Sequence, residues 1–325
     1  MPLTDSYGRV LKDLRISVTP RCNYHCLYCH PLGMQMSDPP GTVSVTDIKH
    51  LLSAAAALGM DAVRFTGGEP LVRRELADMI AAAAETPGVK DVAVTTNGSL
   101  FRKRHKELLA AGLQRLNFSL DALDPQIFAT LTRGADIKQV LDAIELALEL
   151  ELHPVKINAV VIGGVNDSEV VALAALSLEK PLHVRFIEYM HLNNAPFEEY
   201  RRQFVPGEET RRRIEERFGP LQEVATSPSA PARLWRIAAA KGTVGFINSV
   251  SQPFCSNCSR LRLTSDKKIR PCLLTDLELD VSWAFTAADP VGALRQALLT
   301  AAGKKPEKGS TLPTIRQRVM LGIGG

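Results

Sequence analysis

Short apolar runs alternate with longer stretches of helical periodicity through the first two thirds of the chain. The runs are rich in β-branched and aromatic residues and predict strands at 14–19, 62–67, 91–96, 115–120, 155–162 and 183–190. Between several of them, apolar residues recur every three to four positions, which predicts helices that begin at Val45, Arg73 and Ile137. Strand–helix alternation of this kind favours parallel strands joined by helical crossovers. Six such units are too few to close an eight-stranded barrel, so we expect an open, partial (βα)6 barrel.

The last third of the chain has a different pattern. Residues 223–234 are rich in Ser, Ala and Pro, and we interpret them as a linker or a long loop. Strand-like runs follow at 234–238 and 243–250, and a helix is expected from Asp289, with Pro290 in its first turn. The predicted fold class is therefore α/β, with a partial TIM-like barrel at residues 1–222 and a C-terminal α+β domain at residues 223–325.

Composition and charge exclude several classes of protein. The 325 residues include 39 basic and 35 acidic ones, a net charge of +4 without long runs of one sign, so we expect no nucleic-acid surface. No window approaches about 18 uninterrupted apolar residues, so we expect no membrane span. The first residues lack a basic start followed by an apolar core, so we expect a cytoplasmic protein.

All six cysteines fall into two groups. The first cysteine group is Cys22, Cys26 and Cys29, and the second cysteine group is Cys255, Cys258 and Cys272. Without a secretion signal, such thiols favour a metal site or catalysis over disulfides. Structural zinc sites need four ligands, whereas iron–sulfur clusters use thiolates and are usually held by four cysteines. Three cysteines therefore leave one iron of a four-iron cluster open, as in catalytic metal sites.

The second cysteine group leaves two interpretations open. A zinc knuckle is the simpler one, although three cysteines do not complete it. Arg260 and Arg262 alternate on the strand that leaves Cys258, and planar guanidinium groups are suited to bidentate phosphate contacts. A cluster with an open iron beside a phosphate-binding strand is the alternative.

Polar residues and turns collect where the predicted strands end. The first cysteine group follows the first strand, "GGEP" (67–70) the second, "TNG" (96–98) the third, and "SLDA" (119–122) ends the fourth. Met190 ends the sixth strand. Because function collects at the carboxyl ends of parallel strands, the sequence predicts one site at this rim.

Cations also lie within the predicted strands, at Arg15, Arg64, Lys156 and Arg185. Buried cations require anions. Either acidic partners such as Glu188 neutralise them, or the barrel interior binds a polyanion such as a phosphate chain.

The first cysteine group resembles that of the radical S-adenosylmethionine enzymes. The spacing C-x3-C-x2-C, the aromatic Tyr28 before the last cysteine, and the downstream "GGEP" together carry this resemblance. In that superfamily the open iron binds the amino and carboxylate groups of S-adenosylmethionine. Electron transfer then splits the sulfonium and gives a 5′-deoxyadenosyl radical.

Over nearly its whole length the chain resembles one family of that superfamily, the GTP 3′,8-cyclases, which begin molybdenum cofactor biosynthesis. The blocks "VRFTGGEPLVRR", "TTNG", "SLDA", "VKINAVV", "RFIEYM" and "CSNCSRLRLT" carry it, with a terminal Gly-Gly. The resemblance implies abstraction of hydrogen from C3′ of GTP and closure onto C8, which gives 3′,8-cyclo-7,8-dihydro-GTP. It also implies an electron donor protein, a downstream cyclic pyranopterin monophosphate synthase, and a monomer or homodimer.

The resemblance further implies a role for each matching residue. The two cysteine groups would hold two [4Fe–4S] clusters, the second with its open iron at the guanine edge. Contacts to S-adenosylmethionine are expected from Tyr28, Gly68, Ser119 and Met190. Contacts to GTP are expected from Arg15, Arg64, Thr95, Lys156, Arg185, Arg260 and Arg262. Catalytic roles are expected for Arg260, Arg262, Gly324 and Gly325, with the glycine tail threaded into the site.

Two positions depart from the family pattern. His30 follows Cys29 where methionine is usual, and Ala62 stands where many members carry a lysine near the triphosphate. Two other classes of protein stay open at this point. One is a radical S-adenosylmethionine peptide maturase with one auxiliary cluster, and the other is a zinc-stabilised binding protein without catalysis.

Overall fold

Six parallel strands form the centre of the molecule, as the sequence predicts. The computed structural model describes residues 2–29, 36–312 and 314–324. The strands are β1 (Asp13–Ser17), β2 (Ala62–Thr66), β3 (Asp91–Thr96), β4 (Arg115–Ser119), β5 (Val155–Val161) and β6 (Leu182–Glu188). They pair in chain order, each parallel to the next, and each lies within two residues of its expected bounds. The partial (βα)6 barrel is confirmed.

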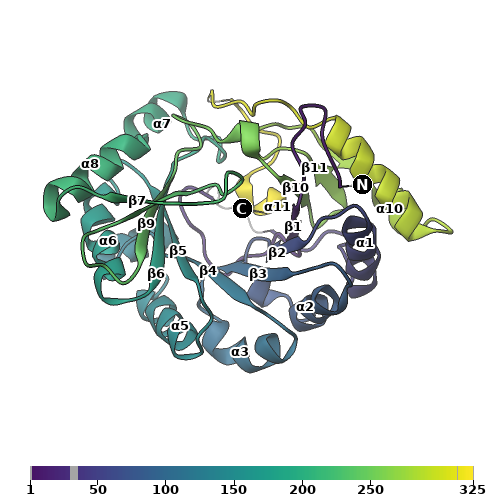
Figure 1. Ribbon diagram of the computed structural model, residues 1–325, viewed down its shortest axis with the longest axis horizontal. Helices are drawn as coiled ribbons and strands as arrows, with labels where there is room; N and C mark the ends of the chain where they lie inside the picture. Colours follow the sequence, from purple (N-terminus) through teal and green to yellow (C-terminus); the bar gives the residue numbers. More distant parts are fainter. Residues whose placement is uncertain (1, 30–35, 313, 325) are drawn as a thin grey trace.

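Helices cover the outside of this curved sheet (Figure 1). They are α1 (Val45–Ala57), α2 (Leu76–Glu85), α3 (Phe101–Ala110), α4 (Pro125–Thr132), α5 (Ile137–Glu149) and α6 (Val170–Glu179). The helices expected at Val45 and Ile137 begin there. The start expected at Arg73 is wrong: α2 begins at Leu76, because Arg73 is extended (φ −75°, ψ 120°) where it ends the turn η1 (Pro70–Val72). In this turn Leu71 N donates to the Glu69 carboxylate.

The C-terminal third extends the same sheet at both edges. β9 (Thr243–Ile247) pairs parallel with β6, and β10 (Arg260–Leu263) pairs parallel with β1. Beyond them lie β8 (Arg233–Arg236), β7 (Gln222–Val224), β11 (Lys268–Arg270) and β12 (Leu279–Asp280), all antiparallel to their neighbours. Residues 225–232 are the loop of the β7–β8 hairpin, so of the two interpretations of this segment the long loop is correct.

The remaining helices lie around and within the ring of strands. They are α7 (Phe197–Gln203), α8 (Gly207–Phe218), α9 (Ser282–Phe285), α10 (Pro290–Gly303) and α11 (Met320–Ile323). α10 begins where the sequence predicts, with the Asp289 carboxylate accepting from Gly292 N, and it packs against α1. α11 lies inside the ring in Figure 1. In the described part of the chain, no helix has the length and apolar character needed to cross a membrane.

Strand alternation separates an apolar outer face from a polar interior. Ile16, Phe65 and Phe118 are fully buried in the core between the sheet and the helices. Their neighbours in sequence point into the barrel, because side chains alternate along a strand. Pairing register then aligns these inward side chains in rows: Arg15 lies beside Arg64 on β2 and beside Arg262 on β10. The fold thereby brings together cations that are more than two hundred positions apart in the sequence.

Candidate active site

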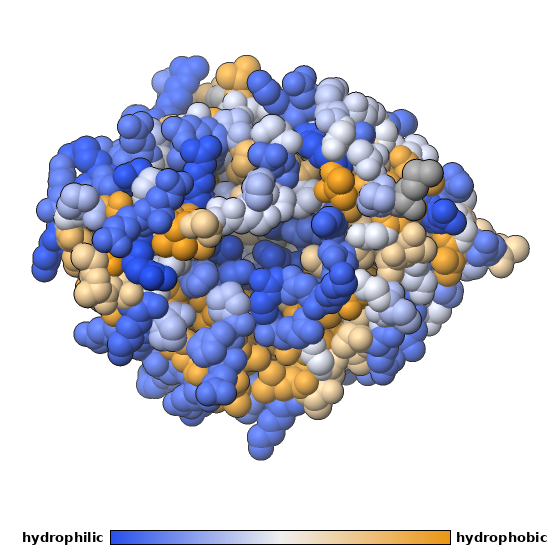
Figure 2. Space-filling model, viewed as in Figure 1, coloured by the Kyte–Doolittle hydropathy of each residue, from blue (hydrophilic) through white to orange (hydrophobic). Residues whose placement is uncertain are grey.

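A cavity of about 270 Å³ lies inside the barrel and extends from the carboxyl ends of its strands to the amino end of β10. Figure 2 shows the molecule hollowed near the centre of the face in view, with hydrophilic residues gathered around the hollow. Both cysteine groups line the cavity, one from the loop after β1 and one from the C-terminal third. Of the other predicted site residues, those that line it are Arg15, Tyr28, Arg64, Gly68, Thr95, Ser119, Arg185, Met190, Arg260 and Arg262.

The "GGEP" segment holds the loop that carries the first cysteine group. Gly68 N donates to Thr19 O (2.8 Å), and Glu69 N donates to Arg21 O (2.8 Å). A Cβ atom at position 68 would lie 2.3 Å from the carbonyl oxygen of Arg21, well inside van der Waals contact. Only glycine allows the two backbones to approach this closely, which is the physical reason for the glycine pair at this strand end.

The first cysteine group lies in an electronegative environment. Burial raises the pKa of the Cys22 thiol to about 12, and burial together with the Asp121 carboxylate raises the pKa of Cys26 well above its usual range. Glu69 is 1% exposed, and burial raises its pKa to about 7. The free thiols are therefore protonated at neutral pH, and metal binding there must release protons.

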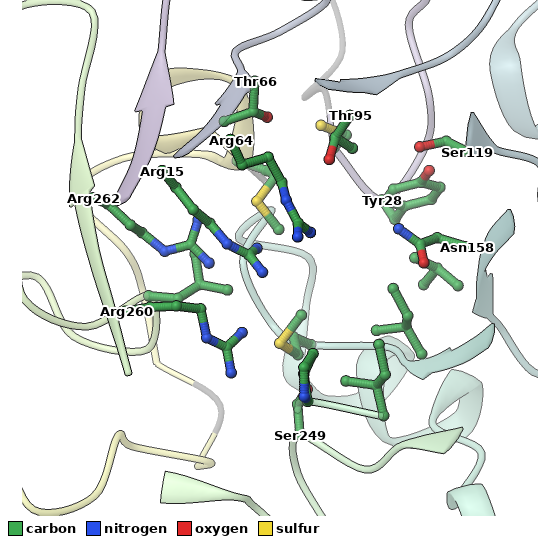
Figure 3. Close-up of a pocket in the computed structure, with 18 of the residues that line it drawn as sticks. Arg15, Tyr28, Arg64, Thr66, Thr95, Ser119, Asn158, Ser249, Arg260 and Arg262 are labelled. Carbon is green, nitrogen blue, oxygen red and sulfur yellow. The ribbon is translucent and has the colours of Figure 1, made fainter. Parts of the chain in front are cut away.

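Asp121 connects Tyr28 of the first cysteine loop to β5. Its carboxylate accepts from the Tyr28 hydroxyl (2.9 Å) and from Val160 N (2.8 Å), and burial raises its pKa to about 6. Ser119 lies two residues earlier, at the end of β4. Figure 3 shows Tyr28 and Ser119 on the same side of the cavity, across from the arginines. The four residues expected to contact S-adenosylmethionine thus share one cavity with the first cysteine group.

Arginines form the facing wall. Arg64, Arg15 and Arg262 stand side by side across β2, β1 and β10, and Figure 3 shows these side chains, with that of Arg260, reaching into the cavity. Burial and mutual repulsion lower the pKa of Arg15, and burial lowers the pKa of Arg262 to about 10. Several buried guanidinium groups that repel one another are suited to binding a polyanion.

Several donors of this wall lack a hydrogen-bond partner in the described part of the chain. They are Arg15 Nε, Arg64 Nε and Arg260 Nη2, all buried, and Arg185 Nε, on β6, is a further buried donor of this kind in the same cavity. Asp13 lies 3.8 Å from Arg15 Nε, too far for a hydrogen bond. Buried donors without acceptors are costly, so the wall fits an anionic ligand that supplies several oxygen atoms.

The alternative that Glu188 neutralises these cations is wrong. Both oxygens of its buried carboxylate accept hydrogen bonds from backbone N–H groups, those of Gly207, Val250 and Ser251. Glu188 therefore anchors the chain after β9.

Asp13 is an acidic partner of the arginine wall, because, against the effect of burial, Arg15, Arg64, Arg260 and Arg262 lower its pKa. One carboxylate facing four guanidinium groups leaves the wall with a net positive charge.

Two predicted residues lie at the margin of the cavity. Lys156 occupies the interior face of β5 beside Asn117, two positions before Asn158, and is not among the residues that line the cavity. The Gly324 carbonyl accepts from Arg262 Nη1 (2.5 Å), so the tail reaches the arginine wall. Its φ is +72°, and a Cβ atom there would lie 2.9 Å from Ser17 Cβ. Gly325 and His30 lie outside the described residues. Ala62 begins β2, on the face that carries Arg64.

The second cysteine group is brought together by the β10–β11 pair. Cys255 begins the turn η3 (Cys255–Asn257), Cys258 follows it, and Cys272 lies just after β11. Burial opposes ionisation of Cys258, but Arg260 and Lys305 outweigh burial and lower its pKa to about 7. This group is thus electropositive where the first is electronegative, and its thiolate form is the form that binds metal.

The residues present fit two iron–sulfur clusters at opposite ends of one cavity. All six cysteines are free and partly buried. Among the described residues, no three His, Cys, Asp or Glu side chains are arranged around a single metal ion. In a [4Fe–4S] cluster the thiolates bind different iron atoms, so its ligands stand farther apart than those of one ion.

Sequence reasoning missed some residues of this site. Asp121 and Asn158 line the cavity, and both lie within blocks that the sequence analysis had already singled out. Lys305 also lines it, from a charged segment after α10 that gives no motif. The strand-end rule could have found Asp121, and the period-two alternation that identified Lys156 also places Asn158 on the same face of β5, but neither finds Lys305.

Comparison with known proteins places this site in a family. The family model "Radical SAM superfamily" matches residues 16–176, and the model "Molybdenum Cofactor Synthesis C" matches residues 182–311. The chain is 40% identical to the GTP 3′,8-cyclase of Pelotomaculum thermopropionicum, over 99% of this chain and all of that protein. It is also 40% identical to the GTP 3′,8-cyclase of Heliobacterium modesticaldum, with the same coverage. The chain belongs to the GTP 3′,8-cyclase family.

Solved structures confirm the fold at lower sequence similarity. Streptococcus suis SuiB bound to S-adenosylmethionine has a TM-score of 0.59 and 16% identity, over 92% of this chain and 76% of that one. The protein anSMEcpe with bound AdoMet has a TM-score of 0.59 and 13% identity, over 94% of this chain and 82% of that one. At these identities the likeness concerns the fold alone.

Proposed function

We propose that this protein converts GTP to 3′,8-cyclo-7,8-dihydro-GTP with S-adenosylmethionine and two [4Fe–4S] clusters, the first step of molybdenum cofactor biosynthesis. The observation that carries the proposal is one cavity with a three-cysteine group at each end and a wall of unpaired arginine donors between them. Residues 1–222 supply the first cysteine group, and residues 223–325 supply the second.

Cys22, Cys26 and Cys29 hold the first cluster in this proposal. Tyr28, Gly68, Ser119 and Met190 contact S-adenosylmethionine beside it, since they share the cavity wall next to these cysteines. When bound, the cluster and S-adenosylmethionine supply the 5′-deoxyadenosyl radical that takes a hydrogen atom from C3′ of GTP. The protein itself orients the two substrates and excludes water from the cavity.

GTP lies along the arginine wall in this proposal. Arg15, Arg64 and Arg262 direct guanidinium groups at one region. The unpaired Nε groups of Arg15 and Arg64 provide donors for phosphate oxygens. Thr95 and Arg185 line the same cavity, and Lys156 lies at its margin as a longer-range cation.

The guanine end of GTP points to the second cluster. Cys255, Cys258 and Cys272 hold that cluster and leave one iron for the base. Arg260 and Arg262 are the part of the arginine wall that lies on β10, the strand that follows Cys258. The tail with Gly324 and Gly325 sets the position of Arg262 through the Gly324 carbonyl. These four residues are the proposed catalytic set of the chain.

The reaction also requires partners. An electron donor protein reduces the first cluster, and a cyclic pyranopterin monophosphate synthase consumes the product. We propose that the enzyme acts in the cytoplasm, where GTP is available, as a monomer or homodimer.

The proposal is tested on chain purified and reconstituted without oxygen. We expect about eight irons per chain and, with dithionite, S-adenosylmethionine and GTP, formation of 5′-deoxyadenosine and the cyclised nucleotide. Cys255→Ala is the matched variant, and it is expected to keep about four irons and to lose cyclisation.

Two outcomes would contradict the proposal. Formation of 5′-deoxyadenosine with GTP unchanged indicates a different substrate, such as a peptide. A chain that takes up zinc and no iron indicates a binding protein.

A further inference from the structure

Two buried cations without an assigned role lie against the second cysteine group. Arg9 is 8% exposed and Lys305 is 4% exposed, although both residue types normally extend into solvent. Arg9 comes from the N-terminal segment and Lys305 from the segment after α10, so both lie outside residues 255–272, which carry the second cysteine group.

Lys305 joins two of the cysteine-bearing segments. Its ammonium donates to Pro271 O (2.6 Å), one residue before Cys272, and to Arg260 O (2.9 Å), two residues after Cys258. The ammonium thus uses two of its three donors on backbone beside cysteines and faces the cavity that these cysteines line.

The position of Lys305 is set by a rigid element. Lys305 N donates to Ala302 O (3.1 Å) at the end of α10, and α10 packs against α1. The ammonium is therefore held in place before any metal binds.

Arg9 holds the third cysteine-bearing segment. Its Nη1 donates to Cys255 O (2.8 Å) and to Glu307 O (2.9 Å), and its Nη2 donates to Pro306 O (2.7 Å). The Asp5 carboxylate fixes the guanidinium from the other side, 2.5 Å from Nε. Arg9 therefore joins the backbone at Cys255 to the backbone of Pro306 and Glu307, which follow Lys305.

The same C-terminal segment closes over Cys272. A Cβ atom at Gly309 would lie 3.0 Å from Cys272 Sγ and 2.7 Å from Leu274 Cβ, so only glycine fits without a shift. Ser310 N donates to Leu274 O (3.2 Å) and fixes the segment there.

We propose that Arg9 and Lys305 are positioning residues of the second cluster site. Together they hold all three cysteine-bearing segments at fixed separation, and Lys305 places a positive charge beside the bound cluster. Three thiolates on a [4Fe–4S]²⁺ core give a net charge of −1, and reduction adds another negative charge. A neighbouring cation therefore stabilises the loaded site and makes its reduction potential less negative. The inference rests on the proposed second cluster.

Substitutions at Lys305 separate its hydrogen bonds from its charge. Lys305→Arg keeps donors and charge, Lys305→Gln keeps donors only, and Lys305→Met removes both. Lys304→Met is the matched control, because Lys304 is the exposed lysine next in sequence. Each full-length chain is reconstituted without oxygen. Iron per chain, the rate of iron loss to a chelator, and the reduction potential of the second centre are then measured.

We expect Lys305→Met to lose the iron of the second centre roughly tenfold faster or more than the unchanged chain, since two hydrogen bonds from a charged donor are removed. In Lys305→Gln the potential of the second centre becomes more negative, whereas Lys305→Arg and Lys304→Met keep the original potential. Arg9→Met is expected to accelerate iron loss without the same change in potential, because Arg9 contacts backbone rather than the cavity.

The outcomes distinguish this inference from the proposed function. Unchanged iron loss in Lys305→Met and an unchanged potential in Lys305→Gln, with about eight irons in the unchanged chain, overturn the positioning role alone. Fewer than about five irons in the unchanged chain overturn the second cluster itself.

Discussion

Cysteines at the two ends of one cavity differ in acidity because their neighbours differ in charge. Burial acts to raise the thiol pKa at both ends. Around Cys22 and Cys26 the nearby Glu69 and Asp121 are acidic, whereas Cys258 faces Arg260 and Lys305. The environment of Cys22 and Cys26 disfavours the free thiolate, whereas that of Cys258 favours it. Metal binding by Cys22 and Cys26 is therefore coupled to proton release, and metal binding by Cys258 much less so.

This difference predicts the order in which the metal-free thiols are alkylated. At pH 7.5 Cys258, with a pKa of about 7, is largely thiolate, while Cys22, with a pKa of about 12, is thiol. We expect iodoacetamide to modify Cys258 at least roughly tenfold faster than Cys22, as measured by peptide mass spectrometry. The same reaction in denaturant is the control and should equalise the two rates. Equal rates in the folded chain would contradict the assigned environments.

The lowered pKa of Lys156 leads us to expect that the protein takes up a proton when GTP binds. Burial, with repulsion from Arg115 and Arg185, lowers the pKa of Lys156 to about 7. At pH 8 most of this side chain is neutral, whereas Arg185, with a pKa of about 9, is still largely charged. Phosphate nearby stabilises the ammonium and raises its pKa, so the complex holds more protons and affinity falls as pH rises above 7.

Isothermal titration calorimetry at pH 8 in two buffers of different ionisation enthalpy measures this uptake. We expect up to about one proton per GTP bound, and much less in Lys156→Gln. Lys138→Gln, at an exposed lysine paired with Asp142 on α5, is the control and should match the unchanged chain. If Lys156→Gln took up as many protons on GTP binding as the unchanged chain, another group would be the one that gains the proton, and the role assigned to Lys156 would be wrong.

At the scale of elements, close backbone contacts join the strand ends into one site. The β2 end reaches the loop of the first cysteine group through Gly67 and Gly68, and a Cβ at either position would lie within 2.5 Å of a backbone oxygen. A displaced backbone here moves the cysteines themselves, so the sequence of this turn determines the geometry of the metal site.

Gly68→Ala is expected to damage the first site selectively. The clash is with backbone that cannot move away cheaply, so we expect a loss of about 1–3 kcal/mol in the free energy of unfolding, measured by denaturant titration of the metal-free chain. Iron should fall from about eight to about four per chain. Gly303→Ala is the matched control, because a Cβ there meets nothing within 4 Å. Full iron content in Gly68→Ala would show that the turn tolerates a side chain.

The C-terminal tail is the second element whose removal is informative. Gly324 is tied to the arginine wall by one charged hydrogen bond, so deletion of residues 324 and 325 should lower turnover about tenfold or more. The unfolding midpoint should stay unchanged, because the deleted residues add little to the core. Ile315→Ser, at an exposed position of the same segment, is the control for turnover. Unchanged turnover in the deletion would remove the tail from the catalytic set.

At the scale of the whole molecule, one continuous sheet brings both cysteine groups to one cavity. β9 and β10 pair with opposite edges of the six-stranded barrel, at β6 and β1. The C-terminal third therefore completes the wall of the barrel and does not merely attach to it. Arg262 lies beside Arg15 because of the pairing register of β10 on β1, although the two residues are far apart in the sequence.

This arrangement explains what the sequence could and could not predict. Period-two alternation identified Arg15 and Arg64 as members of one interior face, and strand ends identified the first cysteine group. Register between β1 and β10 has no local signal, because it depends on how a distant strand docks on an edge. Lys305 was missed for a similar reason, since it acts through backbone carbonyls that no side-chain pattern records.

Transfer of hydrogen from C3′ of GTP to 5′-deoxyadenosine tests the central claim most directly. The reconstituted chain is incubated without oxygen with reductant, S-adenosylmethionine and GTP deuterated at C3′, and the 5′-deoxyadenosine is analysed by mass spectrometry. The account predicts 5′-deoxyadenosine that carries deuterium, together with cyclised nucleotide. Unlabelled 5′-deoxyadenosine with GTP left intact would contradict it.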